Sequence, residues 1–364
     1  MPVESTLSHR LFLPAPQLAL ERLFTMNDYK HTARKITLAL FTLCTLFASS
    51  AGAVTICVYD PSGANGDIFQ MMKDYKVSAL ELGVSVELKP YTDEKIASED
   101  FKAKQCDGVL MTGTRGRSLN SFSSTLEAMG ALPTYQLLKS VLKPLLSSPK
   151  GAKLLNPTGS TEVAAVFPGG SIYLLVRDRS VDTVEELAGK RIATLDFDQA
   201  AKTMVAHVKA SMSAADVSTF AGMFNNGSVD AAYAPAVAYK ALELYKGVGS
   251  TGGVIRFPLA QMTLQLFIHS ERFPEGFGQK SRELSFKQFD RALATVKRGE
   301  DEIKDGLWVD ISGEDRVRYE RMFQEVRLLL RDKLKVYDGK ALKIMRIARC
   351  REDGARAECA EKKE

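Results

Sequence analysis

The stretch "VTICVYDPSGANGD", residues 54–67, joins a β-branched strand to a turn rich in glycine, aspartate and proline. Residues 68–82 then carry apolar side chains at helical spacing, which predicts a helix. The same order follows at once, because residues 84–91 and 107–113 are predicted strands with a short polar segment between them. Strands that alternate with helices in this way predict an α/β fold on a parallel sheet with covered faces.

Downstream, a helical region, a second α/β unit and a helical end follow one another. Two strands joined by Pro-Gly-Gly are predicted at 162–167 and 171–177, and a helix is predicted over 199–212. Three further helices are predicted after residue 280. In one of them we expect a single face to pack against the protein, formed by Val317, Phe323, Val326, Leu330 and Leu334.

This order predicts a two-lobe periplasmic binding protein fold, type II-like, with hinge strands and C-terminal helices. The chain forms one α/β lobe, leaves it to form a second, and returns to finish the first with helices. Such lobes close around a ligand by hinge bending. We expect residues 54–165 and 265–364 to form lobe I, and residues 166–264 to form lobe II.

The first 53 residues have the features of a leader. Lys30, Arg34 and Lys35 precede an apolar run at 36–47, which is shorter than the ~20 residues needed to span a bilayer. Ala51-Gly52-Ala53 then offers the small-x-small pattern of a signal peptidase site. We expect residues 26–53 to be a removed signal peptide, residues 1–25 to be an upstream extension of the true start, and the remaining protein to be periplasmic.

Charge and cysteine content narrow the class of protein further. The net charge of the whole chain is +5, which implies neither a nucleic-acid partner nor an anionic membrane surface, and we expect a monomer. Cys57, Cys106, Cys350 and Cys359 remain after the leader, and four cysteines in an exported chain allow three disulfide pairings. We favour the pairs 57–106 and 350–359 over free thiols, because the first two cysteines lie at neighbouring predicted strands and the last two bracket a short segment.

Signatures of catalysis are missing after the leader. Residues 247–252 match GxGxxG, but they follow a predicted helix and precede a predicted strand, the reverse of a dinucleotide site. His207 and His269 belong to no metal-ligand or triad pattern. We therefore expect a binding protein without enzyme activity, cofactor or metal.

Five predicted loops lie where open α/β sheets bind ligands, at the C-terminal ends of strands. They supply hydroxyl and amide groups, charges, aromatic rings and accessible backbone. The candidate ligand-binding residues are Ser62, Asn65, Thr112, Thr114, Arg115, Arg117, Gly170, Ser171, Asp196, Phe197, Asp198 and Tyr233. Ordinary turn chemistry explains each residue singly, so the hypothesis depends on the convergence of the loops.

The stretches "VDTVEELAGKRIATL" (181–195), "FNNGSVDAAYAPAVAYKAL" (224–242) and "LPTY" (132–135) resemble the periplasmic receptors of TRAP transporters, the DctP-like proteins. The tail "VYDGKALKIMRIARC" (336–350) is similar to the AdeT group of solute-binding proteins, which are often labelled as parts of an efflux pump linked to aminoglycoside resistance. The resemblance implies a receptor that captures a small molecule between its lobes for a TRAP-like or efflux-related membrane component. The alternative is a periplasmic accessory protein in aminoglycoside tolerance that binds no nutrient.

One departure from these receptors concerns the charge of the ligand. They carry an arginine in the Gly-x-Lys-Ile-Arg pattern that pairs with a ligand carboxylate. Here Ala193 occupies that slot, or else Arg191 stands one place away from it. Asp196 is predicted to face the cleft and to suit an ammonium group, whereas Arg115 and Arg117 could hold a carboxylate instead. We expect a cationic or zwitterionic ligand rather than a dicarboxylate.

Overall fold

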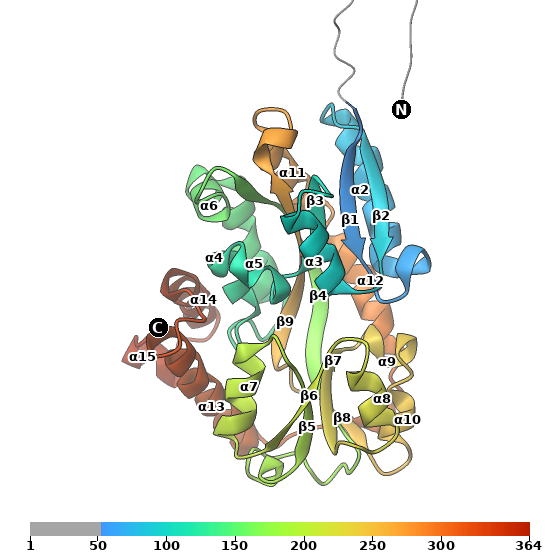
Figure 1. Ribbon diagram of the computed structural model, residues 1–364. Helices are drawn as coiled ribbons and strands as arrows, with labels where there is room; N and C mark the ends of the chain where they lie inside the picture. The colour runs from blue at the N-terminus through green and yellow to red at the C-terminus, as the bar shows by residue number, and fades with distance from the viewer. Residues whose placement is uncertain (1–51) are drawn as a thin grey trace, which may run out of the picture. The chain divides into compact units, whose positions relative to one another are not determined.

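The computed structural model describes residues 52–364 (Figure 1). The predicted upstream extension and all but the last two residues of the predicted signal peptide lie outside this range. The strands are β1 (Val54–Tyr59), β2 (Val86–Tyr91), β3 (Gly108–Thr112), β4 (Thr161–Val176), β5 (Arg191–Leu195), β6 (Ser211–Ala215), β7 (Ala231–Pro235), β8 (Gly253–Ile255), β9 (Ala260–His269) and β10 (Trp308–Val309). The predicted lobe boundaries stay predictions, because these residues form one compact unit.

All ten strands belong to one sheet, whose main path runs β2-β1-β3-β9-β4-β7-β5-β6. At the β1 end (β1, β2 and β3) and at the β5 end (β5, β6 and β7), neighbouring strands are parallel. Between them, β9 pairs antiparallel with β3 and β4, and β4 pairs antiparallel with β7. The prediction of a parallel sheet is therefore right at the two ends and wrong at the centre, where β4 takes the chain across and β9 brings it back.

β4 is one strand of 16 residues, so the loop predicted at residues 167–171 is wrong. The register against β9 shifts between Pro168 and Gly170, and Gly170 has a φ of +117°. An extra residue in a β-bulge bends a strand without ending it, and glycine adopts this φ without a steric penalty. The Pro-Gly-Gly sequence is thus a bulge within the strand that joins the two ends of the sheet.

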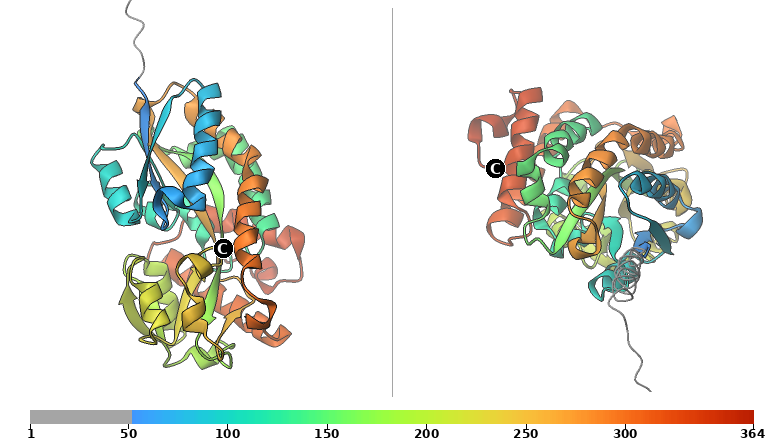
Figure 2. Two further views of the ribbon diagram at one scale, coloured as in Figure 1. Left: turned by 90° about the vertical axis from the view of Figure 1, so that its right-hand side faces the viewer. Right: turned by 90° about the horizontal axis from the view of Figure 1, so that it is seen from above.

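Helices cover both faces of the sheet (Figures 1 and 2). They are α2 (Asp67–Glu81), α3 (Glu94–Lys102), α4 (Ser121–Ser124), α5 (Tyr135–Ser147), α6 (Pro149–Leu155), α7 (Gln199–His207), α8 (Phe220–Asn225), α9 (Ala238–Ala241), α10 (Tyr245–Val248), α11 (Phe277–Lys287), α12 (Phe289–Asp301), α13 (Gly313–Asp332), α14 (Gly339–Glu352) and α15 (Ala357–Glu361). The C-terminal helices are confirmed. In α13 the predicted face is buried at Phe323, Val326 and Leu330, but Val317 is 59% exposed, and Leu334, which lies beyond the end of the helix, is 44% exposed.

The helix predicted over residues 199–212 ends early. α7 stops at His207, Lys209 has a φ of +57°, and residues from Ser211 onward form β6. A positive φ at a residue other than glycine interrupts a helix. Pairing with β5 along all five residues of β6 then outweighs the local helical preference.

Alternating side chains of the central strands supply two apolar layers. Ile56 and Val58 of β1 pack on one face with Tyr75 of α2, whereas Cys57 packs on the other face in the cluster that contains Val141 of α5. Successive side chains of a strand point to opposite faces, so a strand covered by helices on both sides must be apolar throughout. This requirement explains why Ile56, Cys57 and Val58 follow one another in β1 without a polar residue.

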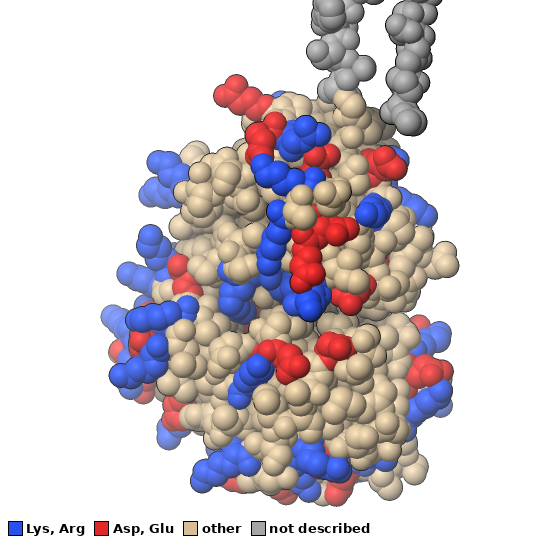
Figure 3. Space-filling view, viewed as in Figure 1, with Lys and Arg blue, Asp and Glu red and all other residues tan. Residues whose placement is uncertain are grey.

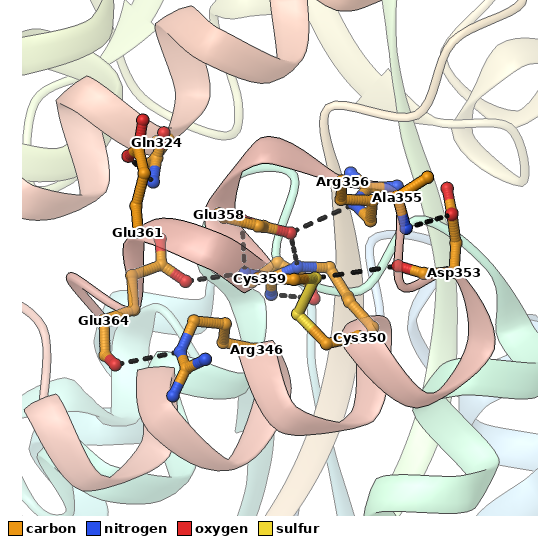
Figure 4. Close-up of a disulfide and its surroundings, with 12 residues drawn as sticks. Gln324, Arg346, Cys350, Asp353, Ala355, Arg356, Glu358, Cys359, Glu361 and Glu364 are labelled. Atoms are coloured by element: carbon orange, nitrogen blue, oxygen red, sulfur yellow. Dashed lines mark hydrogen bonds and ion pairs between the residues drawn. A yellow bond between two sulfur atoms is a disulfide. The ribbon is translucent and has the colours of Figure 1, made fainter.

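Both predicted disulfides are present. Cys57 of β1 is bonded to Cys106, just before β3, and Cys350 of α14 is bonded to Cys359 of α15, with Cα–Cα distances of 5.9 Å and 5.6 Å. The first bond ties two neighbouring strands together within the core, where both cysteines are buried. The second holds α15 against the end of α14 (Figure 4).

We predict that protein purified from an oxidising compartment resists alkylation at all four cysteines, even when it is unfolded in urea, until a reductant is added. Burial alone would protect a thiol only in the folded state. Peptide mapping of alkylated samples with and without reductant distinguishes the two cases. Labelling of Cys57 and Cys106 in unfolded, unreduced protein would show that they are free thiols.

Next to the second disulfide, buried arginines bind two glutamates of the tail. Arg349 contacts both Glu358 and Glu364, and its Nη1 donates to the carbonyl of Ala131 at 2.6 Å. Arg327 also pairs with both glutamates and donates to the carbonyl of Met129 at 2.7 Å. These contacts fix the tail to residues 129–131, which lie shortly before α5. Charge-assisted hydrogen bonds of this kind are among the strong ones.

We predict that Glu358→Gln lowers the free energy of unfolding at pH 7 by about 3–5 kcal/mol, as when one partner of a buried ion pair is removed. Burial alone would raise the pKa of Glu358, but the hydrogen bond and charge of Arg349, with the charges of Arg327 and Arg356, hold it at about 2. Because this lies below its ordinary value of 4.5, the stabilisation is present above pH 4.5 and is lost as the pH falls towards 2.

Urea unfolding of the wild type and the variant between pH 7 and pH 2 measures this difference. The gap in stability should close as the pH falls through that window. Glu352→Gln, at an exposed glutamate of α14, is the control and should track the wild type. A gap that stays constant down to pH 2 would contradict the assignment to Glu358.

Candidate ligand-binding pocket

A pocket of about 200 Å³ lies where the segments after β1, β3, β5 and β7 meet, so both ends of the sheet contribute to it. Six of the predicted residues line it: Ser62, Thr112, Thr114, Phe197, Asp198 and Tyr233. The strands β4 and β9 add Ile172, Met262 and Leu264 to the wall. On the face seen in Figure 3, charged side chains of both signs gather over α3 and immediately below it. The predicted convergence of loops therefore occurs for four of the five loops.

β5 shows which of its residues face the pocket. Ala193 and Leu195 line it, whereas Ile192, which precedes Ala193, is buried in the core. Alternation along the strand places Ile192 on the face opposite Ala193 and Leu195. Arg191 shares their face but is exposed at the start of the strand, where its guanidinium pairs with Asp230 at 2.8 Å. Ala193 is therefore the residue that β5 presents at the position where an arginine was expected from the resemblance.

Several predicted site residues lie elsewhere. Asn65 is exposed in the turn before α2. Gly170 lies in the β4 bulge, and Ser171 is buried in β4, where its hydroxyl accepts from Gln261 at 2.9 Å. Asp196 is exposed and does not line the pocket. The prediction that Asp196 faces the cleft is wrong because β5 ends at Leu195 and Asp196 lies in the turn that leads to α7, with its side chain exposed.

Glu127, which no sequence pattern indicated, joins three segments beside the pocket. Its Oε1 accepts from the backbone amides of Gly113 and Thr263, both at 2.8 Å, and from the Thr263 hydroxyl at 2.7 Å. Its Oε2 accepts from the amide and hydroxyl of Thr114 at 2.7 Å and 2.6 Å. Burial raises the pKa of Glu127, and the hydrogen bonds from Thr114 and Thr263 oppose that shift. The carboxylate holds the loop after β3 against β9.

Glu94 has a similar position on the opposite side of that loop. It is buried at the start of α3, and its Oε1 accepts from the amide of Thr112 at 2.7 Å. Its Oε2 pairs with Nε of Arg115 at 3.3 Å. Burial raises the pKa of Glu94, and Thr112 and Arg115 oppose the shift. The guanidinium of Arg115 also lies 3.4 Å from the ring centroid of Phe197, so it connects the β1 end of the sheet to the β5 end.

Arg117 and Asp198 both line a smaller cavity of about 40 Å³ beside the pocket. Arg117 donates to the carbonyl of Val336 at 3.3 Å and lies over the ring of Tyr337. Asp198 caps α7, with its Oδ1 accepting from the amides of Ala200 and Ala201 at 3.0 Å and 3.1 Å. Burial raises the pKa of Asp198, whereas the Ala201 amide and the charge of Arg117 lower it.

Other kinds of site find no support in residues 52–364. Within that range, no group of three or more His, Cys, Asp and Glu side chains could hold a metal ion. No helix in the same range is long and apolar enough to cross a membrane. The GxGxxG match at residues 247–252 begins at the end of α10 and stops just before β8, so it follows a helix and precedes a strand as predicted.

Comparison with known proteins agrees with a binding site rather than a catalytic one. The family "Solute-binding protein AdeT 1/2" matches residues 77–364. "Probable solute-binding protein AdeT1" of Acinetobacter baumannii is 38% identical over 303 residues, which cover 83% of this chain and 99% of the relative. The chain belongs to the AdeT1/2 solute-binding protein family. "Probable solute-binding protein AdeT2" of the same organism is 25% identical over 232 residues, covering 64% of this chain and 96% of that protein.

Solved structures place this AdeT1/2 family member in a wider fold group. A TRAP periplasmic solute-binding protein from Desulfovibrio salexigens matches with a TM-score of 0.67 at 13% identity, covering 82% of this chain and 99% of that chain. One from Desulfovibrio desulfuricans matches with a TM-score of 0.67 at 15% identity, covering 84% and 99%. At such identities the match shows the fold. The predicted fold class and family resemblance are confirmed, and a family of solute-binding proteins agrees with the expectation that the chain is not an enzyme.

We predict that Arg115→Met destabilises this AdeT family member by about 3 kcal/mol, because it leaves the buried carboxylate of Glu94 without its cation. The double variant Arg115→Met/Glu94→Gln should recover most of the loss, since glutamine still accepts from the Thr112 amide. Urea unfolding measures both.

The control for this pair is Arg191→Met, which breaks an ion pair whose side chains are 50% and 38% exposed. It should change the free energy of unfolding by less than about 1 kcal/mol. A loss at Arg115 no larger than the control, or no recovery in the double variant, would show that Glu94 does not depend on Arg115.

Proposed function

We propose that the protein is a periplasmic receptor that captures a small molecule in this pocket and presents it to a membrane transport component. The observation that carries the proposal is the position of the pocket, which is lined by segments from both ends of the sheet and by the two strands that join them. A concave, mainly apolar site with few polar groups is the usual form of a small-molecule site. A ligand held by both ends favours the closed arrangement over an open one.

The relatives support the same proposed function. The two AdeT proteins are described as solute-binding proteins, and the structural neighbours are periplasmic binding proteins of TRAP transporters. Bound molecules in those neighbours include orotic acid, sn-glycerol-3-phosphate and succinate. The leader pattern at residues 26–53 fits export to the periplasm. The predicted lobes would then be 54–165 with 265–364, and 166–264, with β4 and β9 as the hinge strands.

We predict that at least one compound in a metabolite library raises the thermal stability of the mature protein. A ligand at about 100 times its Kd adds about 2.7 kcal/mol to the stability of the folded state. Ala238→Phe should abolish the response, because Ala238 lines the pocket from α9 and a ring there fills it. Ala152→Phe makes the same change at a half-buried alanine of α6 outside the pocket and should leave the response intact.

Aminoglycosides form a second arm of the screen. An accessory protein in antibiotic tolerance without a nutrient ligand would respond to no metabolite. No response to either library, or a response that survives Ala238→Phe, would overturn the receptor proposal.

A further inference from the structure

We infer that the ligand is a small organic monocation with an apolar body, whose charged group pairs with Asp198 among the aromatic side chains of the pocket. The inference rests on the proposed function, since it names the chemical class that the same pocket would take. It differs from the bound acids of the structural neighbours in the sign of the charge.

The pocket wall carries more negative than positive charge. Its lining includes five carboxylates and no lysine or arginine: Asp60, Asp67, Glu94, Glu127 and Asp198. Three cations lie close by. Arg115 pairs with Glu94, and the charges of Arg117 and Lys202 reach Asp198. The carboxylates still exceed the cations by two, next to apolar walls where charges are poorly screened. Such a wall attracts a cation and repels an anion.

Only one shielded carboxylate of the pocket lining keeps an oxygen available to a ligand. Asp60 accepts from the amides of Ser62 and Phe69 through its two oxygens. Both oxygens of Glu94 and of Glu127 are also engaged. Asp67 is exposed, so water screens its charge. Asp198 uses only Oδ1 to cap α7, and no donor among residues 52–364 reaches its Oδ2. Asp198 therefore keeps an acceptor for a charge-assisted hydrogen bond.

Aromatic side chains line the same pocket as that carboxylate. Phe197, Phe220 and Tyr233 all line the pocket, and Asp198 follows Phe197 directly. The guanidinium of Arg115 already lies 3.4 Å from the centroid of the Phe197 ring. This contact shows that the site accommodates a cation against a ring face, an attraction that grows when water is excluded. A ligand ammonium beside Tyr233 or Phe220 would repeat it.

An anion would find no lysine or arginine in the pocket lining itself, since Arg115 pairs with Glu94 and Arg117 donates to the carbonyl of Val336. β5 presents Ala193 where a cationic anchor would be needed, and Arg191 is engaged with Asp230 at the surface. The hydroxyl of Thr114 already donates to Glu127. Burying a carboxylate ligand without a cation or enough donors costs several kcal/mol. A polycation is disfavoured for the converse reason, because only one pocket carboxylate has a free, shielded oxygen.

The test compares three molecules of nearly equal shape and different charge: 2-phenylethylamine, 2-phenylethanol and phenylacetate. Isothermal titration calorimetry at pH 7 and low salt should show the amine binding at least tenfold more tightly than the alcohol, and no binding of phenylacetate. Asp198→Asn keeps an oxygen that caps α7 but removes the charge. The substitution should weaken binding of the amine at least tenfold and leave the affinity for the alcohol unchanged.

Asp196→Asn is the matched control, since it makes the same charge change two residues away on an exposed side chain outside the pocket. It should leave the affinity for the amine unchanged. Equal or tighter binding of the alcohol or of phenylacetate would overturn the inference, as would an amine affinity that Asp198→Asn and Asp196→Asn change alike.

The two proposals can fail separately. If phenylacetate or the alcohol binds best and Ala238→Phe abolishes that binding, the receptor proposal stands and the ligand class is wrong. If none of the three binds and the wider screen yields only neutral or anionic ligands, the ligand class is again wrong. If neither the series nor the screen yields any ligand, both proposals fail.

Discussion

The antiparallel ladder between β4 and β9 is the constraint from which the rest of the molecule follows. Along the main path of the sheet, every strand of the β1 end is connected to every strand of the β5 end through this pair. The ladder runs from Thr161 opposite His269 to Ile172 opposite Ala260, and it absorbs two register shifts on the way. β4 and β9 cross the middle of the sheet. The segments after β1 and β3 therefore lie on one side of Ile172 and Met262, and those after β5 and β7 lie on the other. The pocket lies there as a result of the topology.

Buried carboxylates then fix the shape of the pocket wall. Glu127, Glu94 and Asp60 accept backbone amides of the loops that surround the pocket. A buried acceptor with all its donors in place stabilises a loop conformation that an apolar side chain could not specify. The same residues leave a surplus of negative charge around an apolar space. The structural role of these acids and the proposed charge preference of the pocket therefore have one origin.

Local sequence patterns predicted much of the fold, but they predicted less well which way individual side chains point. The apolar run of β1 and the helical period of α13 depend on neighbours in sequence, so they could be predicted. Residues 167–171 were predicted to be a loop between two strands, but they are a bulge within β4. The bulge is stabilised by pairing with β9, about a hundred residues away, which the local sequence does not indicate. Of the two predicted aspartates, Asp198 lines the pocket and Asp196 does not, because a turn, whose path depends on α7, lies between the strand and the helix. Glu127 left no signal, since its partner Thr263 lies 136 positions away.

The fold and the charge of the ligand site are set by different residues. The fold is maintained by the β4–β9 ladder and by apolar clusters such as that around Phe167 and Phe277, and it matches proteins that are only 13% and 15% identical. Ala193 lies on the pocket face of β5, where the strand's own pairing with β6 uses backbone groups alone. A change of side chain there alters the charge of the pocket and leaves those backbone hydrogen bonds unchanged. The shared fold therefore determines how the strand ends are arranged, and the side chains on those strand ends determine the charge of the pocket.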